Sequence, residues 1–192
     1  MATTFGLRLA VAAAVGSIVV GSAAHAGGFA VREQSTSAQG SSFAGSAAGF
    51  DLSSMYWNPA AVTAKSGVNS ESHAALILGQ SDLTATGGSL NNPLLGASTS
   101  GNIGDPAVAP SSYANYQFGR FYFGVSINSP FGLTTKPERN WRGKALGQTS
   151  ELLTVNAAPT VGYKIMPGVS IAAGVQVQYI DARLTSVFSG VP

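Results

Sequence analysis

Two neighbouring segments late in the chain alternate between apolar and polar side chains. In SELLTVNAAPTVGYKI (150–165) the apolar residues fall on one parity, and after the turn MPG the segment 169–179 repeats the pattern. A repeat of two puts successive side chains on opposite faces of a β-strand. The polar face is built mainly of Ser, Thr, Asn and Gln, whereas the exposed face of a soluble sheet normally carries Lys, Glu and Arg. The alternation therefore predicts strands of a transmembrane β-barrel, with one face toward lipid and the other toward a lumen.

The composition agrees with this interpretation. Of the 192 residues, 9% are charged and 45% are hydrophobic, whereas about 25% of a typical soluble domain is charged. The 24 glycines and 9 prolines disfavour a helical bundle. No stretch after Gly27 approaches the roughly 18 apolar residues of a transmembrane helix. The formal net charge of +2 gives no sign of a nucleic-acid partner.

The first 26 residues have the organisation of a secretory signal peptide. Arg8 precedes a run of apolar and small residues from Leu9 to Val20, and AHA at 24–26 fits a cleavage site. The run is too short to span a bilayer as a helix. We expect residues 1–26 to be a cleaved signal, the alternative being an uncleaved N-terminal anchor.

Further strands are expected over Val68–Gln80, Ala107–Gln117 and Phe121–Gly132, which makes about five strands in residues 67–192. The connections between strands are of two lengths: short turns at FGR and MPG, and long connections at Ser81–Pro106 and Thr134–Ser150. Outer-membrane barrels typically have short turns on one side of the membrane and longer loops on the other. About five strands cannot close a barrel, and open edges in lipid leave backbone groups unpaired. We therefore expect an incomplete barrel that belongs to a longer chain, the alternative being assembly from several copies.

The second long connection carries a basic cluster, formed by Lys136, Arg139, Arg142 and Lys144 around Trp141. Cations beside an aromatic side chain can bind nucleic acid. In an exposed loop of a membrane protein they more readily meet water or anionic headgroups, lipopolysaccharide included. We expect outer-membrane lipid, and no nucleic acid, as the partner of this loop.

Residues 27–66 precede the strands and lack their alternation. Small residues dominate this stretch, and Asp51 could cap a helical turn through Ser53 and Ser54. In the motif MYWNPAAV, Asn58 before Pro59 is a turn initiator. We expect a compact plug of turns and short helices, called the hatch below.

The chain resembles the FadL/TodX family of bacterial outer-membrane transporters for long-chain fatty acids and hydrocarbons. The resemblance rests on five sequence segments that occur in this order: GGFAVREQSTSAQGSSFAGSAAG, NPAAV, SPFGL, APTVGYKI and VSIAAGVQVQYIDARL. The resemblance implies an all-β fold, an antiparallel barrel of about 14 strands with an N-terminal hatch. It also implies passive transport by a monomeric barrel without a cofactor. Ligand would pass a hydrophobic pocket and leave sideways into the membrane through a break in the third strand.

The sequence offers a candidate for that break at Ser129, Pro130, Phe131 and Gly132. Pro130 cannot donate a ladder hydrogen bond, and Gly132 permits a kink. Irregular backbone at membrane depth is tolerated where it lines a cavity or is covered by protein. The alternative is a bulge at the outer end of the strand. Pro159 is expected to interrupt its strand too, with no implied gate.

Asn58 and Pro59 match the hatch motif of the family. Asn58 could hydrogen-bond the barrel wall near the break and so pin the hatch against the exit, or the pair could simply shape a turn. Phe29 and Val31 are expected in the lumen, where they could contact an apolar ligand or pack the hatch.

Catalysis finds no support in the sequence. After residue 26 there is one histidine, His73, with no cysteine and no G-x-S-x-G elbow, so a nucleophile with its base is not recognisable. A metal site is not expected either. Two alternatives to the transporter stay open: a porin-like channel, and an outer-membrane lipase whose catalytic residues lie beyond Pro192.

Overall fold

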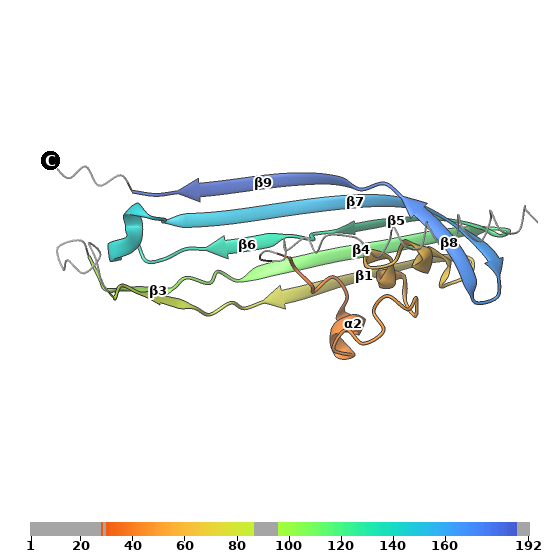
Figure 1. Ribbon diagram of the computed structural model, residues 1–192, viewed down its shortest axis with the longest axis horizontal. Coiled ribbons are helices and arrows are strands. Elements are labelled where there is room, and N and C mark those ends of the chain that lie inside the picture. Colours follow the sequence, from red (N-terminus) through yellow and green to blue (C-terminus); the bar gives the residue numbers. More distant parts are fainter. Residues whose placement is uncertain (1–27, 29, 87–95, 188–192) are drawn as a thin grey trace, which may run out of the picture.

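The computed structural model describes residues 28, 30–86 and 96–187, in which long antiparallel strands run side by side (Figure 1). The expected signal peptide and Phe29 lie outside these residues. The main sheet has the order β1-β4-β5-β7-β6, and β8 and β9 also pair with β7. Its strands are β1 (Val68–Ile77), β4 (Ala107–Phe118), β5 (Phe121–Asn128), β6 (Gly132–Thr135), β7 (Thr149–Met166), β8 (Val169–Gly174) and β9 (Val177–Thr185). A second, two-stranded sheet is formed by β2 (Asp82–Thr84) and β3 (Thr99–Asn102).

Several of these elements are segments of one longer strand. β5 and β6 pair with β7 from the same side, and β8 and β9 keep one register along its other side, with Thr160↔Gly174 and Ala157↔Val177. β1 pairs with β4, and their extensions β2 and β3 pair with each other. The chain thus crosses the sheet about five times, as the alternation predicts.

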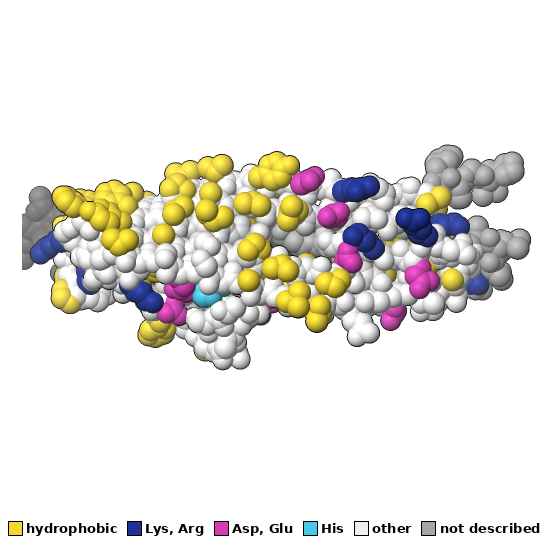
Figure 2. All heavy atoms as spheres, turned by 180° about the vertical axis from the view of Figure 1, so that it is seen from behind, with side chains coloured by type: hydrophobic (Ala, Val, Ile, Leu, Met, Phe, Trp, Pro, Cys, Tyr) yellow, Lys and Arg dark blue, Asp and Glu magenta, His cyan; other side chains and the backbone are white. Residues whose placement is uncertain are grey.

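The two faces of the sheet differ as expected for a barrel wall. Large exposed apolar side chains share the outward parity: Leu76, Val108, Tyr116, Phe121, Phe123, Val125, Ile127, Leu153, Val155, Val161 and Ile171. The opposite parity carries buried polar side chains: Ser111, Asn115, Ser126, Asn128, Thr154, Asn156 and Thr160. Figure 2 shows the hydrophobic side chains spread over much of the length, with many of the charged ones gathered toward one end. The fold is that of an outer-membrane barrel wall.

The hatch lies against the polar face. It contains the helix α2 (Thr36–Gly40) and the 3-10 turns η2 (Leu52–Tyr56) and η3 (Pro59–Thr63). None of the helices in the described part of the chain is long and apolar enough to cross a membrane. A small apolar core joins hatch and wall, formed by Leu52, Met55, Ala61, Val62, Tyr113 and Tyr122.

Glycines in the wall make room for this core. A Cβ on Gly124 would come within 2.5 Å of Val62 Cγ2, and one on Gly162 within 2.5 Å of Val62 Cγ1. Contacts that short are excluded, so only glycine lets η3 approach the strands this closely. The nearby Asn115 amide donates to the carbonyls of Val62 (2.8 Å) and Lys65 (2.7 Å).

Both short turns sit at one end of the sheet, and the long connections at the other (Figure 1). Gly119 (φ +61°) and Gly168 (φ +81°) supply the left-handed backbone of the turns after β4 and after β7. The long connections, expected to be loops, also contain regular structure, namely β2, β3 and a 3-10 turn, η6 (Arg142–Ala145).

The expectation that Pro159 interrupts its strand is wrong. β7 runs through it without a break, and Pro159 stays in register with Val125 of β5. The interruption falls on the other neighbour, because β8 ends and β9 begins opposite this residue. Pro159 has no N–H to donate, and its carbonyl accepts from Val175 N at 3.1 Å.

Candidate functional site

The third long strand is interrupted at Ser129–Phe131, where the sequence predicts a break. Below the interruption Asn128 pairs with Asn156, and above it Gly132 pairs with Leu153. Three residues of the third strand (129–131) therefore oppose two of β7 (154–155). One extra residue on one strand is a β-bulge, which bends the strand and ends regular pairing.

A gap also separates the third strand from the second. Their pairing ends at Ser112↔Ile127 and resumes at the bridge Gly104↔Thr135, where Lys136 N donates to Ile103 O at 2.8 Å. Between these points residues 105–111 and 128–134 are not paired with each other. We call this gap the wall opening.

Prolines on both edges explain why the two strands do not form ladder hydrogen bonds across the wall opening. Pro130 lies on the third strand, and Pro106 and Pro110 lie on the second. A proline nitrogen carries no hydrogen, so it removes a ladder donor from each edge. Pro130 is the proline that marks the break within its own segment; the second edge becomes visible in the sequence when the prolines of adjacent strands are compared.

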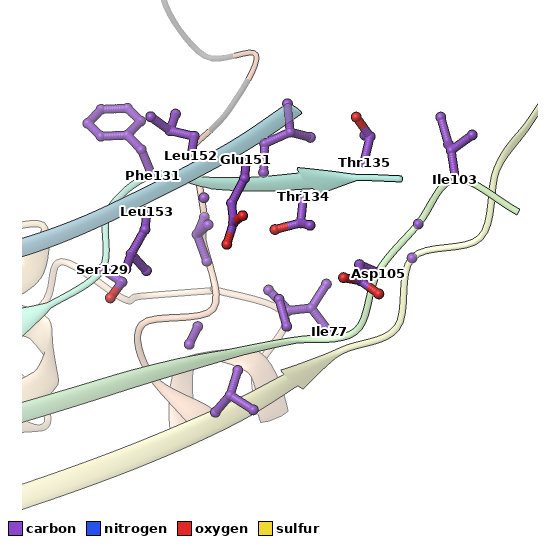
Figure 3. Close-up of a pocket in the computed structure, with 18 of the residues that line it drawn as sticks. Ile77, Ile103, Asp105, Ser129, Phe131, Thr134, Thr135, Glu151, Leu152 and Leu153 are labelled. Carbon is purple, nitrogen blue, oxygen red and sulfur yellow. The ribbon is translucent and has the colours of Figure 1, made fainter. Parts of the chain in front are cut away.

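The wall opening contains a cavity of about 490 Å³. Figure 3 shows its lining, to which both edges contribute: Phe131 and Thr134 on one side, Asp105 and Ile103 on the other. Most of its large side chains are apolar: Val31, Ile77, Ile103, Val108, Phe131, Leu133, Leu152 and Leu153. Polar atoms are few and include the carboxylates of Asp105 and Glu151. A mostly apolar cavity of this size suits a small hydrophobic molecule.

Residues 30–34, here called the N-terminal segment, lie against the third strand where it is interrupted. Ala30 forms an antiparallel bridge with Phe131, and Val31 N donates to Pro130 O at 2.9 Å. Val31 also lines the cavity. The N-terminal segment thus supplies backbone partners at the point where the strand has lost its own.

Thr154 on β7 completes the bonding of the break. Its hydroxyl accepts from Phe131 N (2.9 Å) and donates to Phe131 O (2.6 Å). Together with the N-terminal segment it satisfies backbone groups that would otherwise be costly in an apolar environment.

Gln34 was missed by the sequence analysis, although it contacts both edges of the wall opening. Its side-chain amide donates to Ser129 O at 2.7 Å and accepts from Ser129 N at 3.3 Å. Its backbone carbonyl accepts from the hydroxyls of Ser111 (2.6 Å) and Tyr113 (3.0 Å). A glutamine between Glu33 and Ser35 gives no local signal for these contacts, which depend on residues about 80 to 95 positions away.

Asn58 and Pro59 lie elsewhere. The Asn58 side chain accepts from Ala60 N (3.0 Å), capping η3 with Pro59 in its first turn, and donates to Ala47 O (3.0 Å). Both bonds stay within the hatch, so the structure does not contain the bond to the break that the first interpretation requires. The second interpretation, a turn that shapes the hatch, describes the geometry.

Glu71 and His73 on β1 hold the other side of the hatch. His73 Nε2 lies 2.6 Å from Glu71 Oε1, and His73 Nδ1 lies 2.7 Å from the Thr36 hydroxyl. Glu71 Oε2 accepts from Leu52 N at 2.9 Å, whereas the Asp51 side chain makes none of the cap hydrogen bonds expected of it. Glu71 and His73 thus bind two hatch segments, at Thr36 and at Leu52, to the wall.

The charged groups near the cavity do not leave a basic site for an acidic ligand. Lys136 is bonded to Asp105 at 2.5 Å, and this hydrogen bond raises the pKa of the lysine above its usual value. The lysine is therefore charged and already paired. No Lys or Arg of the described residues lines the cavity. Nor do the described residues contain a group of three or more His, Asp or Glu placed to bind a metal.

Known proteins resemble this chain over nearly all of its length. The family described as outer membrane protein transport protein (OMPP1/FadL/TodX) matches residues 17–191. A long-chain fatty acid transport protein of Salmonella typhi is 28% identical over 178 residues, 90% of this chain and 39% of the relative. Outer membrane protein P1 of Haemophilus influenzae is 25% identical over 190 residues, 89% of this chain and 40% of the relative.

The fold has a counterpart among solved structures. The crystal structure of a Pseudomonas aeruginosa FadL homologue superposes with a TM-score of 0.63 at 24% identity, covering 83% of this chain and 39% of that one. The present chain thus spans about two fifths of the length of these relatives.

Proposed function

The chain belongs to the OMPP1/FadL/TodX family of outer-membrane transport proteins, and from this premise we propose that it forms the hatch and first strands of a passive conduit for hydrophobic compounds. The observation that supports this function is the wall opening, an apolar cavity at a break in the sheet. Compounds of this class would enter the lumen, reach the cavity and leave sideways into the membrane.

The driving force is burial of apolar surface. An apolar ligand gains about 25 cal/mol for each square ångström removed from water, so the cavity lining favours entry without an energy source. Val108, Ile127 and Leu153, exposed on the outer face beside the wall opening, provide continuity with lipid. Transport of this kind requires neither nucleotide nor cofactor.

The gate in this proposal is Ser129–Gly132, closed by the N-terminal segment. Val31 belongs to the pocket, and Phe29 is assigned to it by the resemblance only. Asn58 and Pro59 would affect passage by shaping the hatch. The hatch core supports a plugged conduit over an open porin, because Val62 is packed into the wall.

The loop end of the sheet suits contact with the outer leaflet of the membrane. Arg142 donates to Gly96 O and helps fix the loop, and Trp141 is buried beside it. Arg139 and Lys144 accompany them in the same connection. We assign this basic end to anionic lipid or lipopolysaccharide headgroups, since cations near a membrane surface attract them.

The function can be tested by measuring uptake of labelled oleate and of labelled toluene in parallel. The cells used lack their own transporter and express the complete gene product. Uptake of either compound above that of empty cells supports the proposal and identifies the ligand class. Passage of small sugars with neither compound taken up would instead establish a porin.

A further inference from the structure

Gln34 closes the wall opening at its narrow end. The residue is fully buried. Its side chain forms hydrogen bonds with the backbone C=O and N–H of Ser129 on the third strand. Its backbone carbonyl accepts from the hydroxyls of Ser111 and Tyr113 on the second strand. Gln34 therefore bridges the two edges that fail to pair with each other.

The register explains why a carboxamide is needed there. Ser112 pairs with Ile127 and Gly104 with Thr135, so the position opposite Ser129 is that of Pro110. Pro110 has no N–H to give. The Gln34 side chain offers one donor group and one acceptor, which match the free C=O and N–H of Ser129. It thus gives Ser129 O the donor that Pro110 lacks, and it also accepts from Ser129 N.

The same bonds are easy to exchange. A hydrogen bond inside a protein gives only a modest net gain over its replacement by water or by a polar ligand group. The Gln34 carboxamide is held by hydrogen bonds to Ser129 on the wall and to the Val31 carbonyl (3.2 Å) of its own segment, whereas the hatch core of Leu52, Met55 and Val62 is apolar and tightly packed. The one bond from Gln34 to a member of that core is made by its backbone carbonyl, to the Tyr113 hydroxyl, so release of the carboxamide from Ser129 leaves the packing of Leu52, Met55 and Val62 in place.

We propose that Gln34 is a positioning residue that latches the N-terminal segment across the wall opening, and that release of its carboxamide from Ser129 is the step that opens the exit. This inference rests on the proposed function, because it names the residue that keeps the proposed exit shut. The chemistry assigned to Gln34 comes from its own contacts and not from the hatch motif around Asn58.

A cysteine reporter measures the opening directly. The 192 residues contain no cysteine, so Ala109→Cys introduces the one thiol of this part of the protein, on a buried residue that lines the cavity, and labelling of the protein without the substitution is subtracted. The rate at which a charged, water-soluble maleimide labels this thiol is compared among the complete protein, Gln34→Ala and Gln34→Glu. Gln39→Ala is the matched control, since Gln39 is an exposed glutamine of the same hatch.

We expect Gln34→Ala to raise the labelling rate about tenfold, the change in an equilibrium that one or two hydrogen bonds produce. Gln34→Glu keeps the size of the side chain but sets a carboxylate oxygen against Ser129 O, so we expect a rise at least as large. Gln39→Ala should label like the parent. Wild-type labelling of the Gln34→Glu protein would overturn the latch, because packing alone would then hold the segment.

Two further measurements distinguish an effect on the latch from a loss of folding and from a failure of the proposed transport function. Migration of the unheated protein in a denaturing gel reports whether each variant retains its barrel. If Gln34→Ala does not fold, the labelling rate of Gln34→Glu is used to test the latch. Oleate and toluene uptake by the parent reports the proposed function. Uptake by the parent with no change in labelling on substitution of Gln34 refutes the latch alone. Faster labelling without any uptake by the parent supports the latch and refutes the transport function.

Discussion

The hatch meets the wall in two regions that are held by different forces. Its rear, η2 and η3, packs Leu52, Met55 and Val62 against tyrosines and onto Gly124 and Gly162. Its front, the N-terminal segment, is joined to the wall opening by a set of hydrogen bonds. Each buried apolar side chain contributes about 1.5–3 kcal/mol, whereas a hydrogen bond contributes about 0.5–1.5 kcal/mol net.

This difference teaches how one plug can be both fixed and movable. Separating close-packed apolar surfaces leaves cavities and exposes them to water. Exchanging hydrogen bonds with water or a ligand costs little in comparison. The rear should stay in place while the front moves.

The largest expected effect comes from filling a glycine beneath the rear. In Gly162→Val the added Cβ would lie 2.5 Å from Val62 Cγ1 and 3.0 Å from Thr63 Cγ2. Overpacking of this kind costs about 1–3 kcal/mol, and we expect a lower temperature for loss of the compact gel form. Gly147→Val is the control, because a Cβ there meets nothing within 4 Å. Equal temperatures for the two variants would refute the packed rear.

A comparable loss should follow from removing the hydrogen bonds that tie the rear to the wall. Asn115→Ala deletes two donors, to Val62 O and Lys65 O, and leaves those carbonyls unsatisfied at a cost of about 1–3 kcal/mol. We expect a lower urea midpoint with the wall opening still closed, as reported by the Ala109→Cys thiol. Faster labelling of that thiol would show that rear and front are coupled.

At the front, Thr154→Val should loosen the break with little effect on global stability. The substitution removes the hydroxyl that bonds both Phe131 N and Phe131 O, while the shape of the side chain is nearly retained. We expect faster hydrogen exchange of the Phe131 amide and an unchanged gel transition. An unchanged exchange rate would contradict the role of the Thr154 hydroxyl as the acceptor that protects this amide.

The smallest effect on transport is expected for Asn58→Ala. The side chain caps η3, and loss of such a cap costs about 0.5–2 kcal/mol. Because its two bonds lie inside the hatch, uptake should be unchanged although the hatch is less stable. Slower uptake by a folded Asn58→Ala protein would restore the gating role that the sequence motif suggested.

Local sequence was sufficient for the strands and for the break. The alternation around Val155 and Val161 predicts β7, and Pro130 marks the interruption, because both signals depend on neighbouring residues. The expectation for Pro159 was wrong for an instructive reason: a missing donor disturbs the strand that would receive it, and β7 itself is continuous.

The closing contacts could not be predicted in this way. Gln34 reaches Ser129 across 95 positions of the chain, and its partners follow from the register of the second and third strands. Only the register shows that Pro110, whose nitrogen has no hydrogen to donate, lies opposite Ser129. Asn58 stands in a motif and was one candidate for such a contact, with a simple turn as the alternative, and its bonds are local.

Two engineered disulfides test directly whether the front moves while the rear stays. Ala30→Cys with Phe131→Cys joins two residues of an antiparallel bridge, whose Cα atoms are about 4.5–5.5 Å apart and suit a disulfide. Thr63→Cys with Ser170→Cys joins η3 to β8 where the two hydroxyls lie 2.9 Å apart. Uptake of the transported ligand is measured with each disulfide formed and after reduction. The account predicts that the front disulfide stops uptake, that reduction restores it, and that the rear disulfide has no effect; undiminished uptake with the front disulfide closed would contradict it.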